Sequence, residues 1–175
     1  MIHNEMSYNG FVNLEGFLKT KRNTNISTLS KIGNSELVEK FLSEKINFDR
    51  LNEEENLNGQ LYMASFWGDK EVVKSLILMN ANVNHANPFT LWTPLHAAVF
   101  NEHGLIVTIL LEFKADPMSL DYKGRTAIDF ASASEIIWPF FAVLGYKRTP
   151  RQALIDLEVL EPRTDLNVSK QNSSQ

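Results

Sequence analysis

The sequence predicts an all-α solenoid in which pairs of short helices stack on one another. One phrase returns at a nearly fixed interval: Gly59-Gln-Leu-Tyr-Met-Ala-Ser, Thr93-Pro-Leu-His-Ala-Ala-Val and Thr126-Ala-Ile-Asp-Phe-Ala-Ser begin 34 and 33 residues apart. A weaker copy begins 35 residues earlier, at Thr24. Periods of about 20 to 50 residues are the signature of stacked repeats. Within each period the apolar residues fall at helical spacing and Gly, Asn or Asp interrupts them, which predicts two helices and an extended finger loop.

The repeat that contains Gly59 shows this order most plainly. Its first helix is predicted over 61–66, Gly68 makes the turn, and the second helix covers 71–79. The apolar inner stripe of the second helix consists of Val72, Val73, Leu76 and Ile77. The segment Asn80-Ala-Asn-Val-Asn then leads out into the finger.

The next repeat carries a clear helix start. Thr93 is predicted as its N-cap, with Pro94 at the first helical position, where a missing N–H costs nothing. Its second helix should bury Ile106, Val107, Leu110 and Leu111. Glu102 stands at the turn position that Gly68 holds in the previous repeat, and a non-glycine residue is strained at positive φ. Asn101 or Gly104 could therefore absorb this turn instead.

The chain after Ala131 predicts the end of the stack. The last repeat is about three residues shorter than expected between Ala131 and Glu135, and Pro139 interrupts its second helix. Gly145 is a predicted C-cap, and Thr149 with Gln152 three residues later forms a capping-box pattern. A C-terminal capping helix is expected within 147–162, a disordered tail over 163–175, and a further capping helix in the N-terminal extension, 1–23.

These motifs resemble the ankyrin repeat family, whose pattern runs Gly-x-Thr-Pro-Leu-His-x-Ala-Ala, a Gly-His turn, Glu-Ile-Val-x-x-Leu-Leu and Gly-Ala-Asp-x-Asn. The segments that match in order and register are Thr93 to Ala98, Ala81 to Asn84, Ala115 to Pro117 and Asp121 to Thr126. The resemblance implies an ankyrin repeat solenoid with repeats at about 24–56, 57–90, 91–123 and 124–146. The fingers before Gly59 and Thr93 are longer than the family pattern by two residues and one residue, so their loops are expected to project or bulge. Asn84 is expected to hold its finger through local hydrogen bonds.

Composition excludes several classes of function. A net charge of −4 argues against a nucleic-acid face, and the absence of cysteine removes disulfides, thiol nucleophiles and cysteine metal sites. The longest apolar run, 136–145, is about half of a membrane span, and residues 1–10 lack the pattern of a signal peptide. The expected location is cytoplasmic or nuclear, with neither nucleic acid nor membrane as a partner.

Catalytic motifs are missing from the sequence. It contains no G-x-S-x-G elbow, glycine-rich phosphate loop or H-E-x-x-H pair. His96 and His103 do not have a metal-ligand spacing, and His96 is expected to hydrogen-bond Thr93, as the family's histidine does. We therefore expect no enzyme activity, cofactor or metal, with a small enzyme built on Asp129, Asp121 and a histidine as the rival hypothesis.

The resemblance also implies where a partner would bind, because the family's concave face is built from finger residues and from positions late in each first helix. The corresponding partner-binding residues are Phe66, Trp67, Phe89, Trp92, Phe100, Asn101, Tyr122, Lys123 and Arg125. Most are aromatic, and aromatic residues are enriched among binding hot spots. An aromatic groove that receives a helix or an extended peptide is the first hypothesis. The alternative is that Phe66, Trp67, Trp92 and Phe100 pack together as a side core.

The function predicted from these observations is non-catalytic protein binding, as an adaptor or scaffold that is monomeric when unbound. A regulatory subunit that inhibits an enzyme or a transcription factor is the alternative. One further motif, Lys147-Arg148-Thr149-Pro150-Arg151, predicts either a proline-directed phosphorylation site or a helix cap with solvated charges.

Overall fold

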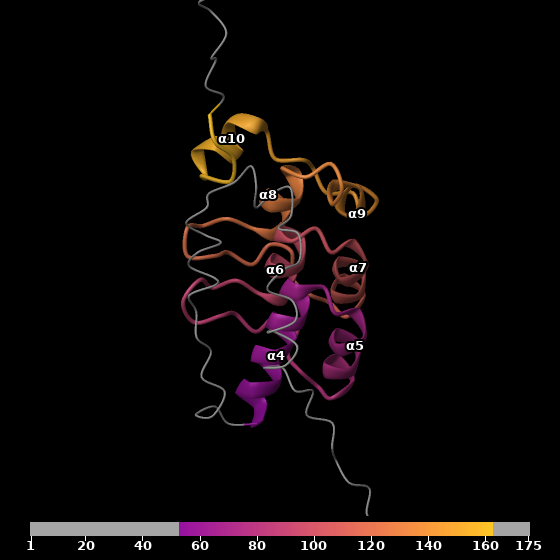
Figure 1. Cartoon of the computed structure of the whole chain (residues 1–175). Helices are drawn as coiled ribbons and strands as arrows, with labels where there is room; N and C mark the ends of the chain where they lie inside the picture. Colours follow the sequence, from indigo (N-terminus) through magenta and orange to yellow (C-terminus); the bar gives the residue numbers. More distant parts are fainter. Residues whose placement is uncertain (1–52, 163–175) are drawn as a thin grey trace, which may run out of the picture.

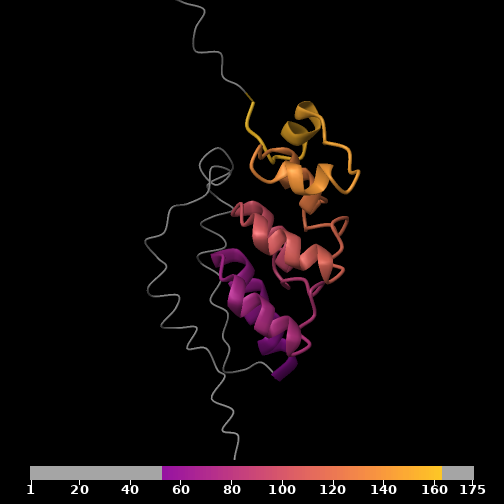
Figure 2. The same ribbon diagram turned by 90° about the vertical axis from the view of Figure 1, so that its right-hand side faces the viewer.

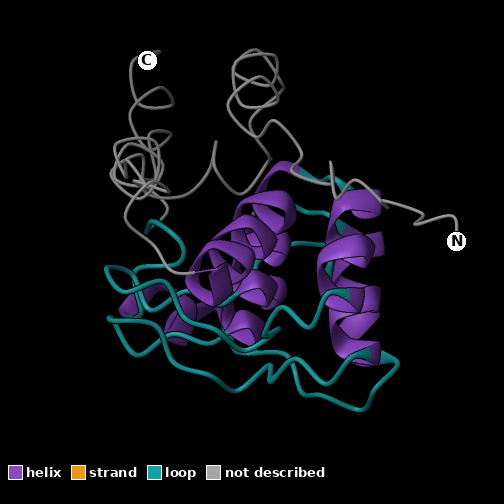
Figure 3. Cartoon of the chain, turned by 90° about the horizontal axis from the view of Figure 1, so that it is seen from below, coloured by secondary structure: helices purple, strands orange, loops and turns teal. Residues whose placement is uncertain are grey.

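The computed structural model describes residues 53–162, and every regular element within that range is an α-helix. The helices are α4 (Glu53–Trp67), α5 (Lys70–Leu78), α6 (Pro94–Phe100), α7 (Gly104–Glu112), α8 (Ala127–Ser132), α9 (Trp138–Ala142) and α10 (Arg151–Asp156). Helices α4, α6 and α8 form an inner row, α5, α7 and α9 form an outer row, and α10 lies at the end of the stack (Figure 1). Viewed along the stack, the finger loops project to one side of the helices (Figure 3). The predicted all-α solenoid is confirmed.

Two inner helices begin with reciprocal capping boxes. The Thr93 hydroxyl accepts a hydrogen bond from the His96 amide, and the Thr93 amide donates to His96 Nδ1 at 3.2 Å. At the start of α8, the Thr126 amide donates to Asp129 Oδ2 at 2.8 Å, and the Thr126 hydroxyl accepts from the Asp129 amide. Each box satisfies amides that a helix N-terminus would otherwise leave without partners. The predicted N-cap at Thr93 is confirmed.

Helix α4 is longer than the sequence pattern predicts. The expected helix covers 61–66, whereas α4 begins at Glu53 and continues through Gly59. The residues before Gly59 that the family pattern places in a long finger are therefore helical. A glycine inside a helix costs about 1 kcal/mol, and the complete burial of Leu61 and Ala64 in the core offsets this penalty. The predicted first repeat and the N-terminal capping helix otherwise lie outside the described residues, as does the predicted tail.

The turns between inner and outer helices need a residue at positive φ. Gly68 takes this role after α4 with φ 83°, and Glu102 takes it after α6 with φ 60°. The expectation that Asn101 or Gly104 would absorb the second turn is therefore wrong. The Glu102 carboxylate accepts a hydrogen bond from Ser134 Oγ at 2.5 Å, so this strained turn is tied to the next repeat.

Each outer helix ends in the same way, with a residue at positive φ directly after its last turn. Asn80, Lys114 and Gly145 hold φ values of 67°, 68° and 83°. The next amide reaches back to close the helix, as in Ala115 N to Leu110 O at 2.9 Å. This geometry reverses the direction of the chain after the helix. The C-cap of α9 is Val143, so Gly145 is not the C-cap itself but supplies the positive φ two residues later.

The end of the stack differs from the prediction in two places. Pro139 lies in the first turn of α9, where no intrahelical N–H donor is required, so it starts this helix instead of interrupting it. Helix α10 has Pro150 as its N-cap and lacks a side-chain cap bond, so the predicted capping box of Thr149 with Gln152 is wrong. Gln152 Nε2 instead donates to Asp156 Oδ1 at 2.9 Å, and Thr149 contacts the last repeat.

Candidate functional site

Four of the nine predicted groove residues are buried. Relative exposure is 4% for Phe66, 1% for Trp92, 2% for Phe100 and 0% for Arg125. The prediction that these side chains line an open groove is therefore wrong. The physical reason is contact between successive repeats: the Trp92 ring centroid lies 4.9 Å from that of Phe100 and 5.4 Å from that of Phe130 in the next repeat.

A buried ionic network fixes Trp92 and the finger that follows α7. Trp92 Nε1 donates to Asp121 Oδ2 at 3.1 Å, and Arg125 Nε donates to the same oxygen at 2.8 Å. The other carboxylate oxygen, Oδ1, accepts the Arg125 amide at 2.9 Å. The guanidinium also lies 4.9 Å from the Phe130 ring centroid. Because breaking a buried ion pair strands a charge, this network is expected to stabilise the packing of Trp92 and the finger.

His96 also has a structural role, as predicted. Its ring is fully buried, Nδ1 accepts the Thr93 amide, and Nε2 lies 3.4 Å from the Arg125 carbonyl oxygen. Burial lowers the His96 pKa to about 4, although the nearby Asp121 charge acts in the opposite direction. The imidazole is therefore neutral near pH 7. Within 53–162, no group of three or more His, Asp or Glu side chains could hold a metal ion.

The residues at the end of α4 and α6 hold neighbouring repeats together. Trp67 is half-buried and packs edge-on against Phe66 with ring centroids 5.1 Å apart. Asn101 Nδ2 donates to the Phe66 carbonyl oxygen at 2.9 Å, and His103 Nε2 lies 2.9 Å from the same oxygen. The two pairs Phe66–Trp67 and Trp92–Phe100 thus each pack internally, in line with the side-core alternative.

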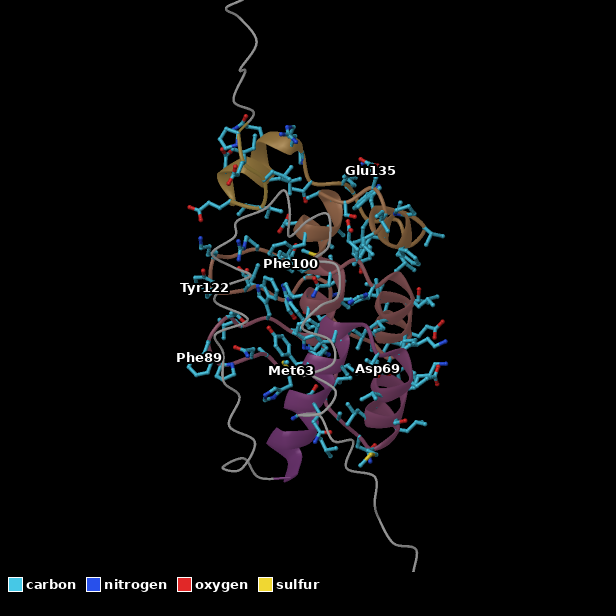
Figure 4. The ribbon with its side chains drawn as sticks, in the orientation of Figure 1. Met63, Asp69, Phe89, Phe100, Tyr122 and Glu135 are labelled. Atoms are coloured by element: carbon cyan, nitrogen blue, oxygen red, sulfur yellow. The ribbon has the colours of Figure 1, made fainter. Side chains whose placement is uncertain are left out.

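Exposed apolar side chains gather instead at the tips of two adjacent fingers. Phe89 is 70% exposed, Leu91 43%, Leu120 59% and Tyr122 40%, and we call these four residues the fingertip patch. The Tyr122 amide donates to the Thr90 carbonyl oxygen at 3.1 Å, which joins one tip to the next. Phe89 and Tyr122 lie one above the other on the finger side, away from the helices (Figure 4).

The first of these fingers carries its extra residue at the tip. Three residues separate Asn87 from Leu91, whereas two separate the corresponding Asp121 and Gly124. Asn87 Oδ1 accepts the Phe89 amide at 2.9 Å and the Thr90 amide at 3.1 Å, so the longer tip is ordered by its own hydrogen bonds. The finger bases are joined through Asn84, whose Oδ1 accepts the Asp116 amide at 2.7 Å and whose Nδ2 donates to the Lys114 carbonyl oxygen at 3.2 Å. Asn84 thus has the expected structural role, but its side chain binds the next repeat and not the local backbone.

Backbone strain accompanies the longer tip. Leu91 has φ 55°, at the position where the next finger has Gly124 with φ 75°. A non-glycine residue in the left-handed region costs about 1–2 kcal/mol, and such strain clusters at functional sites. Leu91 and Leu120 are not among the residues that the sequence predicted for this site. The one-residue insertion before Thr93 is the sequence feature that could have pointed to this finger tip.

Lys123, the remaining predicted site residue, lies beside the fingertip patch but is engaged with the C-terminal segment. Its Nζ forms an ion pair with the Glu158 carboxylate, which raises the Lys123 pKa and lowers the Glu158 pKa. This finger therefore carries the exposed Tyr122 and, through Lys123, contacts the C-terminal segment.

A second set of exposed apolar residues occupies the outer row. Its members lie on or just beyond α5, α7 and α9, which are stacked side by side in Figure 2. We call these residues the outer-face set: Leu78, Met79, Leu105, Phe113, Ile136, Val143 and Leu144. They lie on the helix side of the molecule, and the fingertip patch lies on the finger side. The chain therefore offers two distinct apolar surfaces.

The stacked helix pairs and their projecting fingers define the class: a repeat solenoid, an architecture that offers extended binding surfaces. Residues 61–138 match the family model described as ankyrin repeats, three copies. This part of the chain is an ankyrin repeat domain, and ankyrin repeats generally mediate protein–protein interaction. No helix within the described range is long and apolar enough to cross a membrane.

Curated relatives share this repeat segment. The chain is 30% identical over 102 residues to human (Homo sapiens) ankyrin repeat and SOCS box protein 11, covering 58% of this chain and 30% of that protein. It is 38% identical over 98 residues to mouse (Mus musculus) Rabankyrin-5, covering 54% of this chain and 7% of that protein. It is 36% identical over 76 residues to human ARF GTPase-activating protein GIT1, covering 43% of this chain and 10% of that protein. The chain thus spans less than a third of the length of each.

Proposed function

We propose that this protein is a non-catalytic adaptor or scaffold that binds another protein through the fingertip patch. The observation that carries this proposal is the exposure of four large apolar side chains at two hydrogen-bonded fingertips, with Phe89 at 70%. Exposed apolar groups that gather in one place are typical of binding surfaces. Phe89 and Tyr122 replace the buried Trp92 and Phe100 as the aromatic anchors of the predicted site.

The geometry of the tips supports an apolar helix or an extended segment as the bound element. Asn87 and Asp121 each order one tip through buried side-chain oxygens, so the patch is presented on a fixed backbone. A preordered surface loses little conformational entropy on binding. The side chains present two aromatic rings and two branched alkyl groups, which suit an apolar partner face.

The remaining features of the proposal concern location and assembly. The lack of cysteine and the acidic net charge support a cytoplasmic or nuclear protein that binds neither membranes nor nucleic acid. We propose a monomer in the absence of its partner. The buried networks of Asp121 and His96 support a role without catalysis, because both Asp121 carboxylate oxygens and both His96 ring nitrogens already contact structural partners.

Affinity capture with matched variants tests the fingertip patch. The full chain is compared with Phe89→Ser, Tyr122→Ser and with an outer-face control, Leu105→Ser, Phe113→Ser, and captured proteins are identified by mass. Partners recovered with the wild type and the outer-face control should be lost from the fingertip variant, and binding of a purified partner should weaken by at least about tenfold for two anchors.

The opposite pattern would refute the proposal. If partners are retained by the fingertip variant and lost from the outer-face control, the binding surface lies on the outer row. Circular dichroism checks that both double variants remain folded, since all four substituted side chains are exposed.

A further inference from the structure

Thr149 joins the C-terminal segment to the last repeat. Its hydroxyl donates to Asp129 Oδ1 at 2.8 Å, and its amide donates to Ser132 Oγ at 2.9 Å. Asp129 is buried, and its other oxygen, Oδ2, accepts the Thr126 amide and hydroxyl at the start of α8. One carboxylate therefore caps the last inner helix and holds the segment that leads into α10. We call the pair Thr149–Asp129 the latch.

The segment around the latch has the features of a kinase substrate. Residues 146–150 have neither helix nor strand, and Lys147, Arg148, Pro150 and Arg151 are exposed. Thr149 itself is partly exposed and directly precedes a proline. The sequence contains one other Thr-Pro pair, Thr93-Pro94, which is buried at the start of α6.

We propose that Thr149 is a phosphorylation site for a proline-directed protein kinase and that its phosphate releases α10 from the last repeat. In the reaction the γ-phosphoryl group of ATP forms a bond to Thr149 Oγ1, its bond to the ADP oxygen breaks, and the hydroxyl proton passes to the catalytic carboxylate of the kinase and from there to solvent. That proton is the one now donated to Asp129. A phosphate carries about −1.5 to −2 charge at pH 7, so it replaces a hydrogen bond by repulsion between two anions.

Asp129 has little freedom to move away from this repulsion. The residue is 8% exposed, and its Oδ2 accepts hydrogen bonds from the Thr126 amide and the Thr126 hydroxyl. Moving the carboxylate would therefore uncap α8. The C-terminal segment is the movable partner. Further polar contacts hold this segment: Arg148 binds the Ser132 carbonyl oxygen and the Glu135 carboxylate, and Glu158 pairs with Lys123. Leu154 and Val159 of the segment are also buried.

The phosphate would also compete for one of these attachments. Arg148 Nη2 lies 2.5 Å from the Glu135 carboxylate, whose side chain is largely exposed. Arginine pairs bidentately with phosphate, and Arg148 directly precedes Thr149 in the chain. Phosphorylation therefore breaks the Thr149–Asp129 hydrogen bond and draws Arg148 away from Glu135. The loss of both contacts separates α10 from the last repeat. This proposal does not depend on the fingertip patch.

The test uses the full chain and a proline-directed kinase chosen because it phosphorylates a peptide of residues 144–156. Mass spectrometry locates the phosphate, and hydrogen exchange follows 126–133 and 151–160 before and after the reaction. Thr149 should be modified while Thr93 is not, and exchange over 151–160 should accelerate by at least about tenfold, the factor expected for losing one hydrogen bond to a charged group.

Two variants separate modification from structure. Pro150→Ala keeps the latch and removes the proline, so it should resist the kinase and exchange like the wild type. Thr149→Val should take up no phosphate over 144–156. The proposal is overturned if the folded chain is not phosphorylated at Thr149, or if the phosphorylated chain exchanges over 151–160 like the unmodified chain.

Discussion

Trp92→Ala should cost far more stability than Phe89→Ala, although both side chains are large aromatics of the same finger region. Trp92 is 1% exposed and contacts the rings of Phe100 and Phe130, whereas Phe89 is 70% exposed. Deleting a buried Trp side chain typically lowers the free energy of unfolding by about 3–5 kcal/mol, and an exposed substitution changes it by about 0.5 kcal/mol or less.

Trp92→Phe divides the Trp92 contribution into its two parts. Phenylalanine keeps most of the ring packing but removes the indole N–H that donates to Asp121 Oδ2 at 3.1 Å. Since hydrogen bonds to charged groups contribute about 1.5–3 kcal/mol, this variant should fall between the wild type and Trp92→Ala. Asp121 still accepts from Arg125 Nε, so its charge is not stranded.

Urea unfolding followed by circular dichroism at the helix band measures these differences. With a slope of about 1–3 kcal/mol per molar urea, a loss of 3 kcal/mol moves the midpoint down by about 1–3 M. The Phe89→Ala midpoint should stay within a few tenths molar of the wild type. A Trp92→Ala cost below about 1 kcal/mol, or a Phe89→Ala cost above about 2 kcal/mol, would show that burial has been assigned to the wrong aromatic.

Two further predictions concern backbone strain and pH. Lys114→Gly should raise the free energy of unfolding by about 0.5–1 kcal/mol, because Lys114 is exposed and holds φ 68°. The control Glu112→Gly, at the last residue of α7, should lower the free energy of unfolding by up to about 1 kcal/mol. Equal urea midpoints for the two variants would contradict this. The His96 pKa is lowered from 6.5 to about 4 by burial of the neutral imidazole. The contribution of the buried imidazole to the free energy of unfolding is therefore complete above pH 6.5 and is lost as the pH falls toward 4. The loss is roughly 3 kcal/mol at pH 4, and a His96→Gln variant should lack this part of the pH dependence when unfolding is measured at pH 7, 6, 5 and 4; a parallel decline in both proteins would refute the assignment.

The repeat register was readable from the sequence because local rules produce it. Thr93 with Pro94 marks a helix start, and Gly68 and Gly145 mark chain reversals, through backbone preferences that involve only a few neighbouring residues. The same rules misjudged Glu102 and Pro139. Glu102 accepts positive φ where its carboxylate binds Ser134 of the next repeat, and Pro139 begins α9 instead of breaking it.

The role of Thr149 shows a second limit of local reasoning. Its spacing to Gln152 matches a capping box, yet its hydroxyl binds Asp129, twenty residues earlier in the chain. The helix that follows has Pro150 as its N-cap, so Thr149 lies outside the cap position and its hydroxyl donates to the buried carboxylate instead.

The stack of helix pairs with projecting fingers is predictable from the sequence, because a repeated pattern of caps, turns and apolar residues specifies each unit. Which aromatic side chains face outward is not predictable in this way and depends on tertiary contacts. Trp92 contacts Asp121 of its own repeat and Phe130 of the following repeat and is buried, whereas Phe89, three residues earlier in a finger tip with one inserted residue, is exposed. Burial in a solenoid depends on contacts between neighbouring repeats, and the periodicity of a single repeat does not contain them.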